Sequence, residues 1–439
     1  MKILSNKKIF ILILILLIIS SLSLIGWTAE NNNYQNFNLS KIIKLTLKVN
    51  SQIKIARQKL KVTEANLAKS KANKLPKVNF ESSYTEVGET ESKVTNKDTY
   101  QAGLNGSYPL YTGNKLSKRI NIRDNEVKKA NLNLDNKKNE VIFKVTTDYY
   151  RLLKAKKLVN LTKKALTQVE AHLQVANSRY EAGAVLITDV LKTKVRKTKV
   201  QKDLINAKNK VEIIKSQLKN SIGLSQVKSI SIKGGLKQTN YSLSLEECLE
   251  EAFINRADLK QFQLNLVNYQ TKLEIAKASD SPELMLVGNY KWTGGEMLPE
   301  DNNWDLTLNL QLPLYDGGQT KAVIKEAEAN LKQMKEIKWQ LKEGIALEVK
   351  SSYLDKESAA KMVEVTFKSI QEAKENLRVE RLRYKEGSAT STEVIDAEIS
   401  LTTAKTNYLE AKYNYQMAVA RLIKAMGSYD RRGQYEKKL

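Results

Sequence analysis

Residues 304–317 read WDLTLNLQLPLYDG, and this stretch decides the fold because two different periodicities meet in it. Its first part alternates apolar and polar residues, which is the period-two pattern of a β-strand with one apolar face. After the Pro-Leu-Tyr-Asp-Gly turn the chain has no further proline, and apolar residues recur near every 3.5 residues, which predicts a long α-helix. The helical positions are Val363, Phe367, Ile370, Leu377 and Tyr384.

The same transition occurs earlier in the chain, where residues 100–113 read YQAGLNGSYPLYTG. Other identical residues recur at the same shift of 204 positions: Tyr149 with Tyr353, Arg179-Tyr180 with Arg383-Tyr384, and Gly223 with Gly427. Pro76 and Tyr84 recur as Pro282 and Tyr290, at a shift of 206, which places a hairpin loop of different length between Tyr84 and Pro109. The chain is therefore a tandem duplication of roughly 200 residues, a period too long for a solenoid repeat.

Each half predicts a helix, two strands, a very long helix and a shorter helix. The first repeat is expected at 37–223, with hairpin strands at about 78–110, the long helix at 114–182 and the shorter helix at 188–222. The second is expected at 243–427, with strands at 283–313 and helices at 318–386 and 392–426. Residues 224–242 join the repeats and residues 428–439 form a tail. A helix of this length is a rod on the order of 100 Å.

The N-terminus is typical of a secretory signal. Lys2, Lys7 and Lys8 precede an apolar run at 9–19, and serines follow, so residues 1–29 are expected to be a signal peptide. The alternative is an uncleaved inner-membrane anchor, because apolar character persists to Ile25. No cysteine lies near the cleavage region, so a lipoprotein anchor has no support.

Composition argues against catalysis and against nucleic-acid binding. The net charge of +25 comes from lysines scattered along helical patterns without aromatic interleaving, which indicates solvated helix surfaces. The only cysteine, Cys248, excludes an intrachain disulfide and is expected to be a small buried residue. The only histidine, His172, is expected at the surface or between helices. No nucleophile–base motif, phosphate-binding loop or metal-ligand cluster occurs, so we expect no enzyme activity, cofactor or metal.

The four predicted strands have the length of tilted membrane-crossing strands, with one apolar and one polar face. Four strands cannot close a barrel, and lipid does not tolerate an open sheet edge. Several copies must therefore contribute to one shared barrel, although the residues do not set the number of copies. The alternative is a periplasmic coiled-coil structural or adaptor protein anchored in the inner membrane, which would not require two amphipathic hairpins.

These features resemble the TolC family of outer-membrane efflux and secretion channels, over about residues 37–427. The resemblance is carried by the duplicated order of elements, by the Pro-Leu-Tyr-x-Gly turns, and by two Tyr-x-x-Gly motifs followed by Thr-Asp-Val or Thr-Glu-Val. It implies a homotrimer in the outer membrane, with a twelve-stranded β-barrel in lipid continued by a twelve-helix α-barrel tunnel in the periplasm. It also implies a passive duct for efflux or type I secretion. A periplasmic membrane-fusion adaptor and an inner-membrane transporter of the RND or ABC type would dock at the tunnel tip and open it.

The resemblance also assigns roles to individual residues. Thr188, Asp189 and Tyr384 match residues whose links hold the tip closed, whereas Ala389 stands where the family has an arginine, so one link between copies is missing. Glu393 and Asp396 match acidic residues that form an ion-selective constriction just inside the tip. The residues alone also allow these two acids to be solvated groups near a helix N-terminus, where a negative charge is favourable.

Overall fold

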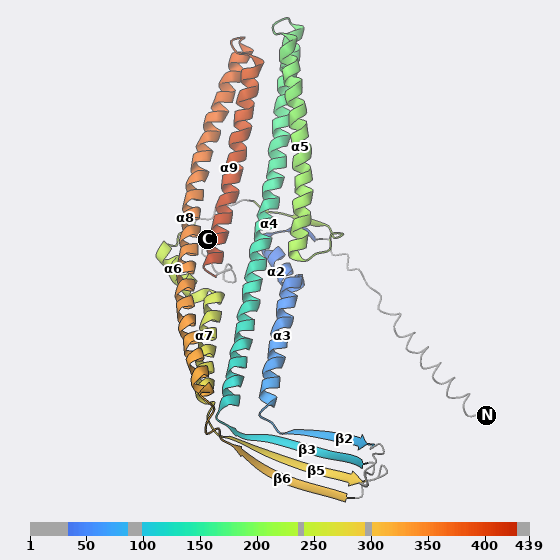
Figure 1. The fold of residues 1–439 in the computed structure, drawn as a ribbon. Coiled ribbons are helices and arrows are strands. Elements are labelled where there is room, and N and C mark those ends of the chain that lie inside the picture. The colour runs from blue at the N-terminus through green and yellow to red at the C-terminus, as the bar shows by residue number, and fades with distance from the viewer. Residues whose placement is uncertain (1–33, 87–98, 236–240, 295–300, 428–439) are drawn as a thin grey trace, which may run out of the picture.

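The computed structural model describes residues 34–86, 99–235, 241–294 and 301–427. The expected signal peptide at 1–29 and the expected tail at 428–439 lie outside these residues, as does the 236–240 part of the expected linker. The described chain is mostly helical and internally duplicated, as the sequence predicts (Figure 1).

Each half contributes one very long helix, and the other helices pair with it. The helices of the first half are α2 (Leu39–Val49), α3 (Ser51–Ala72), α4 (Lys115–Glu181) and α5 (Ile187–Ile222). Those of the second half are α6 (Leu245–Asn255), α7 (Ala257–Lys277), α8 (Gln319–Lys385) and α9 (Ser391–Ala425). Figure 1 shows α5 standing in line with α2 and α3 along α4, and α9 in line with α7 along α8, with α6 beside α8 at mid-height. The four-stranded sheet lies at the opposite end from the α4–α5 and α8–α9 turns.

Left-handed residues begin and end both long helices. Each helix has 67 residues and follows a residue with positive φ, Asn114 at 60° and Gly318 at 90°. At the other end Gly183 (φ 72°) and Gly387 (φ 80°) turn the chain. In both turns the glycine N–H and the next N–H donate back into the last helical turn, the pairing of a Schellman motif. The glycine of each Tyr-x-x-Gly motif is therefore required by backbone conformation.

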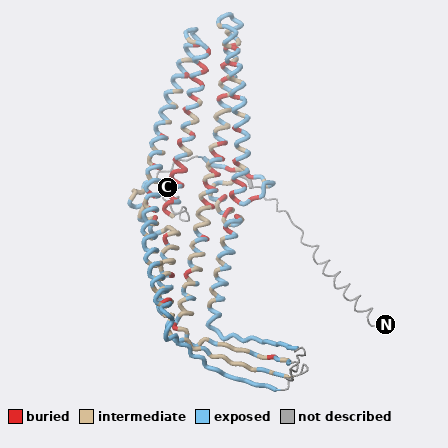
Figure 2. The backbone as a smooth tube through the Cα atoms, viewed as in Figure 1, coloured by how far each residue is buried: buried red, intermediate tan, exposed pale blue. Residues whose placement is uncertain are grey.

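Most buried residues lie along the lines where helices face one another (Figure 2). Two apolar clusters lie where the short helices meet the long ones. One contains Cys248, Leu259, Ile345 and Leu422, and the other Ile42, Val145, Leu152 and Leu218. Cys248 is buried, as its amphipathic context predicts. A two-residue parallel ladder joins β1 (Tyr34–Phe37) to β4 (Ile230–Ile232) beside the second cluster.

The large sheet has the order β2-β3-β5-β6, and all of its strands are antiparallel. The strands are β2 (Lys77–Thr85), β3 (Thr99–Thr112), β5 (Glu283–Gly294) and β6 (Asp301–Gln311). β3 continues past Pro109 because its register shifts between Pro109 and Tyr111, and an irregularity of this kind accommodates a residue without an N–H. β6 instead ends before Pro313, so the two halves leave the sheet differently.

The two faces of the sheet differ in chemistry. Residues that lie opposite one another across neighbouring strands form rows, and one row runs from Phe80 through Leu104 and Tyr290 to Trp304. The next row, on the other face, runs from Asn79 through Asn105 and Asn289 to Asp305. In this row the Asn105 side-chain amide donates a hydrogen bond to Asn289 at 2.6 Å, and the Asn289 amide donates one to Asp305 at 2.9 Å. The apolar face is largely exposed, especially along β6. None of the described helices combines the length and apolar content of a membrane span.

Candidate gate at the helical tip

Tyr384 joins the two helical hairpins near their turns. Its side chain is 3% exposed although it lies at the last turn of α8. The His172 ring on α4 meets the Tyr384 ring edge-on, with centroids 5.2 Å apart. The Arg179 guanidinium lies 4.9 Å from the Tyr384 ring centroid, and Arg179 also donates a hydrogen bond to the Tyr384 carbonyl. Aromatic and cation–π contacts therefore hold α8 against α4.

A buried chain of polar side chains connects the other helices at the same level. His172 Nε2 lies 3.0 Å from Ser391 Oγ on α9, and Ser391 Oγ lies 3.1 Å from Thr193 Oγ1 on α5. The Thr193 hydroxyl donates to the Asp189 carbonyl at 2.8 Å. Because each hydroxyl has one proton, Ser391 donates to Thr193 and His172 donates from Nε2 to Ser391. In this arrangement each of the three buried side chains has a hydrogen-bond partner, and the chain of bonds joins α4, α5 and α9.

The sequence predicts only part of this network. His172 was expected at the surface or between helices, and it lies between helices, 7% exposed. Ser391 and Thr193 carry no motif that marks them, since their contacts depend on how α9 and α5 pack. Burial lowers the pKa of His172 below its ordinary value, and the charge of Arg381 on α8 acts in the same direction. Glu398 on α9 and Asp189 on α5 act against that decrease in pKa.

Acid is expected to loosen the tip through His172. In the unfolded chain this side chain takes up a proton near pH 6.5, roughly the ordinary histidine value, whereas the folded tip takes it up at lower pH. The stabilising contribution of neutral His172 is therefore fully present above about pH 6.5 and declines as the pH falls below that value. Amide hydrogen exchange around His172, compared at pH 5 and pH 7.5 after correction for intrinsic rates, measures the effect. His172→Gln replaces the imidazole N–H donor by an amide N–H donor that does not titrate, so this variant should lose the pH dependence of exchange. If the pH dependence is unchanged in the variant, groups other than His172 cause it.

The structure brings Asp189 and Tyr384 near each other without a hydrogen bond between them. Burial raises the pKa of Tyr384, and the negative charge of Asp189 raises it further. The Tyr384 hydroxyl is buried and has no acceptor among the described residues. Asp189 is half-buried, and Thr188, one residue earlier, is exposed. Within one copy, packing of the Tyr384 ring therefore makes the contact, and its hydroxyl is enclosed without an acceptor among the described residues.

The two acids expected at the constriction are both exposed. Glu393 forms a capping box with Thr390 at the start of α9, in which its carboxylate accepts from the Thr390 N–H at 2.6 Å. This bond lowers the pKa of Glu393 below its ordinary value. Asp396 lies one helical turn further along α9. Glu393 therefore serves as the helix-terminal acid that the residues alone allow, and its exposure leaves the constriction role a prediction.

Ala389, where the resemblance implies an arginine in the family, makes an apolar contact instead. Ala389 packs against the cluster that contains Leu377, Tyr384 and Val394. Arg383 pairs with Glu380 at 2.9 Å and donates to a carbonyl in the same turn, so it stays within its own hairpin. The sequence did not indicate the ion pair between the exposed Arg381 and the buried Glu398, 2.6 Å apart, which joins α8 to α9. The second Glu398 oxygen is buried without a hydrogen-bond partner among the described residues.

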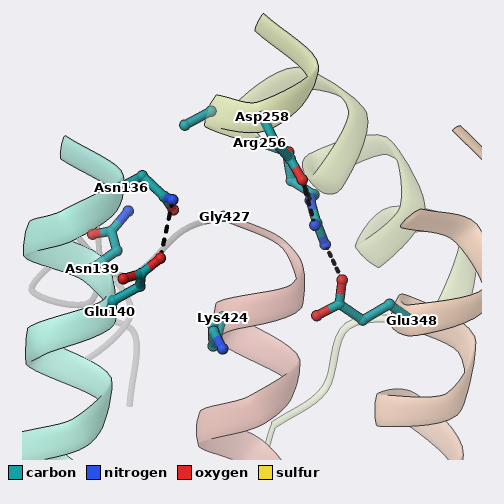
Figure 3. A pocket seen from close by; sticks show the side chains of 9 residues that line it. Asn136, Asn139, Glu140, Arg256, Asp258, Glu348, Lys424 and Gly427 are labelled. Atoms are coloured by element: carbon teal, nitrogen blue, oxygen red, sulfur yellow. Dashed lines mark hydrogen bonds and ion pairs between the residues drawn. The ribbon is translucent and has the colours of Figure 1, made fainter. Parts of the chain in front are cut away.

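A second charged site lies at mid-height, in a cavity of about 230 Å³ (Figure 3). Arg256, between α6 and α7, binds Asp258 and Glu348 and donates to the Ala425 carbonyl at the end of α9. Because Arg256 bonds to acceptors on α7, α8 and α9 at once, we interpret it as a structural link between these helices. The described residues contain no group of three or more His, Cys, Asp or Glu that could hold a metal ion.

Comparisons with known proteins agree with this architecture. A family model described as outer membrane efflux protein matches residues 42–224 and 248–428. The outer membrane protein TolC of Vibrio cholerae is 22% identical over 391 residues, covering 86% of this chain and 87% of the relative. The cation efflux system protein CusC of Escherichia coli K12 is 20% identical, covering 93% and 92%. Crystal structures of CusC (TM-score 0.79, 16% identity, 92% and 95% covered) and of the Campylobacter jejuni CmeC outer membrane channel (0.78, 18%, 94% and 94%) share the fold.

Proposed function

Because this chain belongs to the outer membrane efflux protein family, whose members are channels and not enzymes, we propose that three copies form one passive exit duct in the outer membrane. The duct would join a twelve-stranded barrel to a twelve-helix tunnel and would serve efflux or type I secretion. The observation that carries the proposal is the four-stranded sheet, with an exposed apolar face and two open edges on a helical chain. The family match argues against the alternative of an adaptor anchored in the inner membrane.

The surface between α5 and α9 supports docking of a periplasmic adaptor at the tip. Apolar side chains line an open groove of about 520 Å³ there, and basic side chains stand along it. An amphipathic partner helix with acidic flanks fits such a groove. The inner-membrane pump, of the RND or ABC type, would engage through this adaptor. The apolar residues are Leu191, Val195, Ile395 and Ile399, and the basic ones are Lys192, Arg196 and Lys199.

Site-specific photo-cross-linking in cells tests the docking proposal. A photoreactive residue at Val195, which is 70% exposed in the groove, is expected to give an adduct with an adaptor protein, identified by mass spectrometry. Val365 on α8 is also exposed and lies outside the groove, so the same residue placed there serves as the matched control. Equal adducts at both positions, or an adaptor adduct at Val365 alone, would contradict docking in this groove.

The gate is proposed to act between copies. The half-buried Asp189 carboxylate and the exposed Thr188 side chain support links to a neighbouring copy, whereas the buried Tyr384 hydroxyl would have to be uncovered before it could join them. A hydrogen bond of this kind contributes about 1–3 kcal/mol when its acceptor is charged. Several such links, repeated by threefold symmetry, would hold a closed tip that docking can still open.

Loss of the two tip acids is expected to reduce cation selectivity. Three copies would place six carboxylates of Glu393 and Asp396 around the narrow axis, and such rings favour cations. Glu393→Gln with Asp396→Asn removes the charge while glutamine preserves the capping box. The reversal potential in a salt gradient should then move toward zero. Glu364→Gln, which removes an exposed carboxylate elsewhere on α8, is the control. An unshifted reversal potential in the double variant would leave both acids as helix-terminal groups only.

A further inference from the structure

A basic cavity of about 700 Å³ lies close to the place where the helices meet the sheet. It is bounded by the beginning of α4 and by the ends of α3 and α7 that are next to the sheet (Figure 1). Four basic side chains line it and only one acidic side chain does, so the lining has a net charge of +3. The basic residues are Lys69 on α3, Arg119 and Arg123 on α4, and Lys272 on α7, and the acid is Glu126 on α4.

Three of the four basic side chains have no acidic partner. Arg123 pairs with Glu126 at 2.7 Å, whereas Lys69, Arg119 and Lys272 are exposed and form no ion pair with any acid of the described residues. The nearby acids of α7 and β5 cannot serve them, because they already pair with other lysines of α4. Positive groups that line one cavity repel each other, and a bound anion would relieve this repulsion.

Two contacts place the cavity on the side of the polar face of the sheet. Lys77 begins β2 on the same face as the asparagine row, and its Nζ donates to Asn73 Oδ1 of the cavity lining at 3.2 Å. Glu283 begins β5 on that face as well, and it binds Lys115 at 2.7 Å, one helical turn before Arg119. In the proposed duct the polar face lines the lumen, so the inference below rests on the proposed function.

The side chains of the cavity fit a hydrophilic oxyanion. The Arg119 guanidinium can donate two parallel hydrogen bonds to a phosphate, sulfonate or carboxylate group, and the lysines add charge. Asn66 and Ser70 contribute a neutral amide donor and a neutral hydroxyl donor. Apolar lining comes from Ile122 and Ile275, which is little for an apolar ligand. The volume lies within the range of about 300–1,000 Å³ that is typical of small-molecule sites.

We propose that this cavity binds oxyanion groups, and that its three copies form a basic ring where the barrel meets the tunnel, which favours anionic cargo. Rings of Lys and Arg line pores that conduct anions and phosphate. The tip acids do not neutralise this ring, because they lie at the other end of the long helices, roughly 80 Å away at about 1.5 Å per residue. Charges in salt solution are screened beyond about 8–10 Å.

Calorimetric titration of the purified protein in a neutral detergent tests the site. The probe is myo-inositol hexakisphosphate without divalent cations, and myo-inositol, the same ring without phosphates, is the neutral control ligand. The triple variant Lys69→Gln, Arg119→Gln, Lys272→Gln should raise the Kd for the hexakisphosphate at least about tenfold, because it removes the three basic groups that have no acidic partner. Myo-inositol should give no measurable heat of binding with either protein.

A charge-matched variant separates the cavity from the overall positive charge of the chain. Arg57→Gln, Lys71→Gln, Lys277→Gln also removes one arginine and two lysines, all of them exposed, from α3 and α7. At about 100° per residue these positions lie on the faces of α3 and α7 that point away from the cavity. This variant should bind the hexakisphosphate with a Kd within about twofold of wild type. An equal loss of affinity in both variants, or an unchanged Kd in the cavity variant, would overturn the site.

Reversal potentials in a salt gradient test the ring. Loss of the cavity charges should raise the permeability ratio of potassium over chloride at least about twofold, and the charge-matched variant should leave it unchanged. Lost binding with an unshifted reversal potential would keep the oxyanion site and overturn its role in the conducting path. If light scattering instead shows a monomer that still binds the hexakisphosphate through the cavity, the proposed duct and the ring fail together and the site stands.

Discussion

Tyr384→Ala is expected to raise the basal single-channel conductance of the duct roughly several-fold. The Tyr384 ring contacts His172 on one side and Arg179 on the other, and truncation leaves a cavity between the two hairpins of each copy. Removal of a fully buried aromatic side chain costs about 3–5 kcal/mol. Because the ring joins α8 to α4 next to the turns, much of this loss should fall on the closed tip. Planar-bilayer recordings of the purified protein without an adaptor measure the change.

The duplication supplies the control for this variant. Tyr180 occupies the matching position in the first repeat, but its side chain is 45% exposed, so Tyr180→Ala should leave the conductance near the wild-type value. Tyr384→Phe with Asp189→Ala keeps the ring and removes the hydroxyl and the carboxylate. It is expected to open the tip less than Tyr384→Ala does. Equal conductance of Tyr180→Ala and Tyr384→Ala would show that ring burial does not hold the tip closed.

Leu306→Arg is expected to abolish accumulation of the assembled duct in the outer membrane. Leu306 lies near the middle of β6 on the apolar face and is 65% exposed. A lipid-facing arginine near the bilayer midplane costs about 2–4 kcal/mol, and the trimer would carry one in each copy. Heat-modifiable oligomer in the outer-membrane fraction, followed on denaturing gels, measures assembly.

Thr307→Arg is the matched control, because the neighbouring side chain points to the opposite face of the sheet. A water-filled lumen accepts a charge on that face, so this variant should assemble nearly as well as wild type. If Thr307→Arg blocks assembly and Leu306→Arg does not, the assignment of the two faces is reversed. If both assemble normally, β6 does not cross lipid.

Features with a local cause could be predicted from the sequence. The long helices follow from apolar periodicity without proline, and their ends follow from glycines such as Gly183 and Gly387, which adopt positive φ in both tip turns. The strands follow from alternation, and the duplication shows that both halves use the same elements. The strand ends differ slightly from the expected positions 110 and 313: β3 continues to Thr112, where a register shift in its pairing with β5 tolerates Pro109, and β6 ends at Gln311.

Contacts between distant segments could not be predicted. Ser391 lies 219 positions from His172, and their hydrogen bond exists only because α9 packs beside α4. The ion pair of Arg381 with Glu398 likewise depends on how α8 faces α9. Tyr180 and Tyr384 are equivalent in sequence, and only tertiary packing makes one exposed and the other buried. The roles of Thr188, Asp189, Glu393 and Asp396 remain predictions, since they require neighbouring copies.

His172 is the only histidine in the chain, and it lies in the contact between the two hairpins. Isotope labelling of histidine would therefore place one NMR-active ring per copy at the tip, with no engineered probe. Its imidazole chemical shifts report both the tautomer and the surrounding ring currents, so one resonance would follow opening and closing. In a symmetric trimer the resonance stays single, and its splitting would reveal copies that open one at a time.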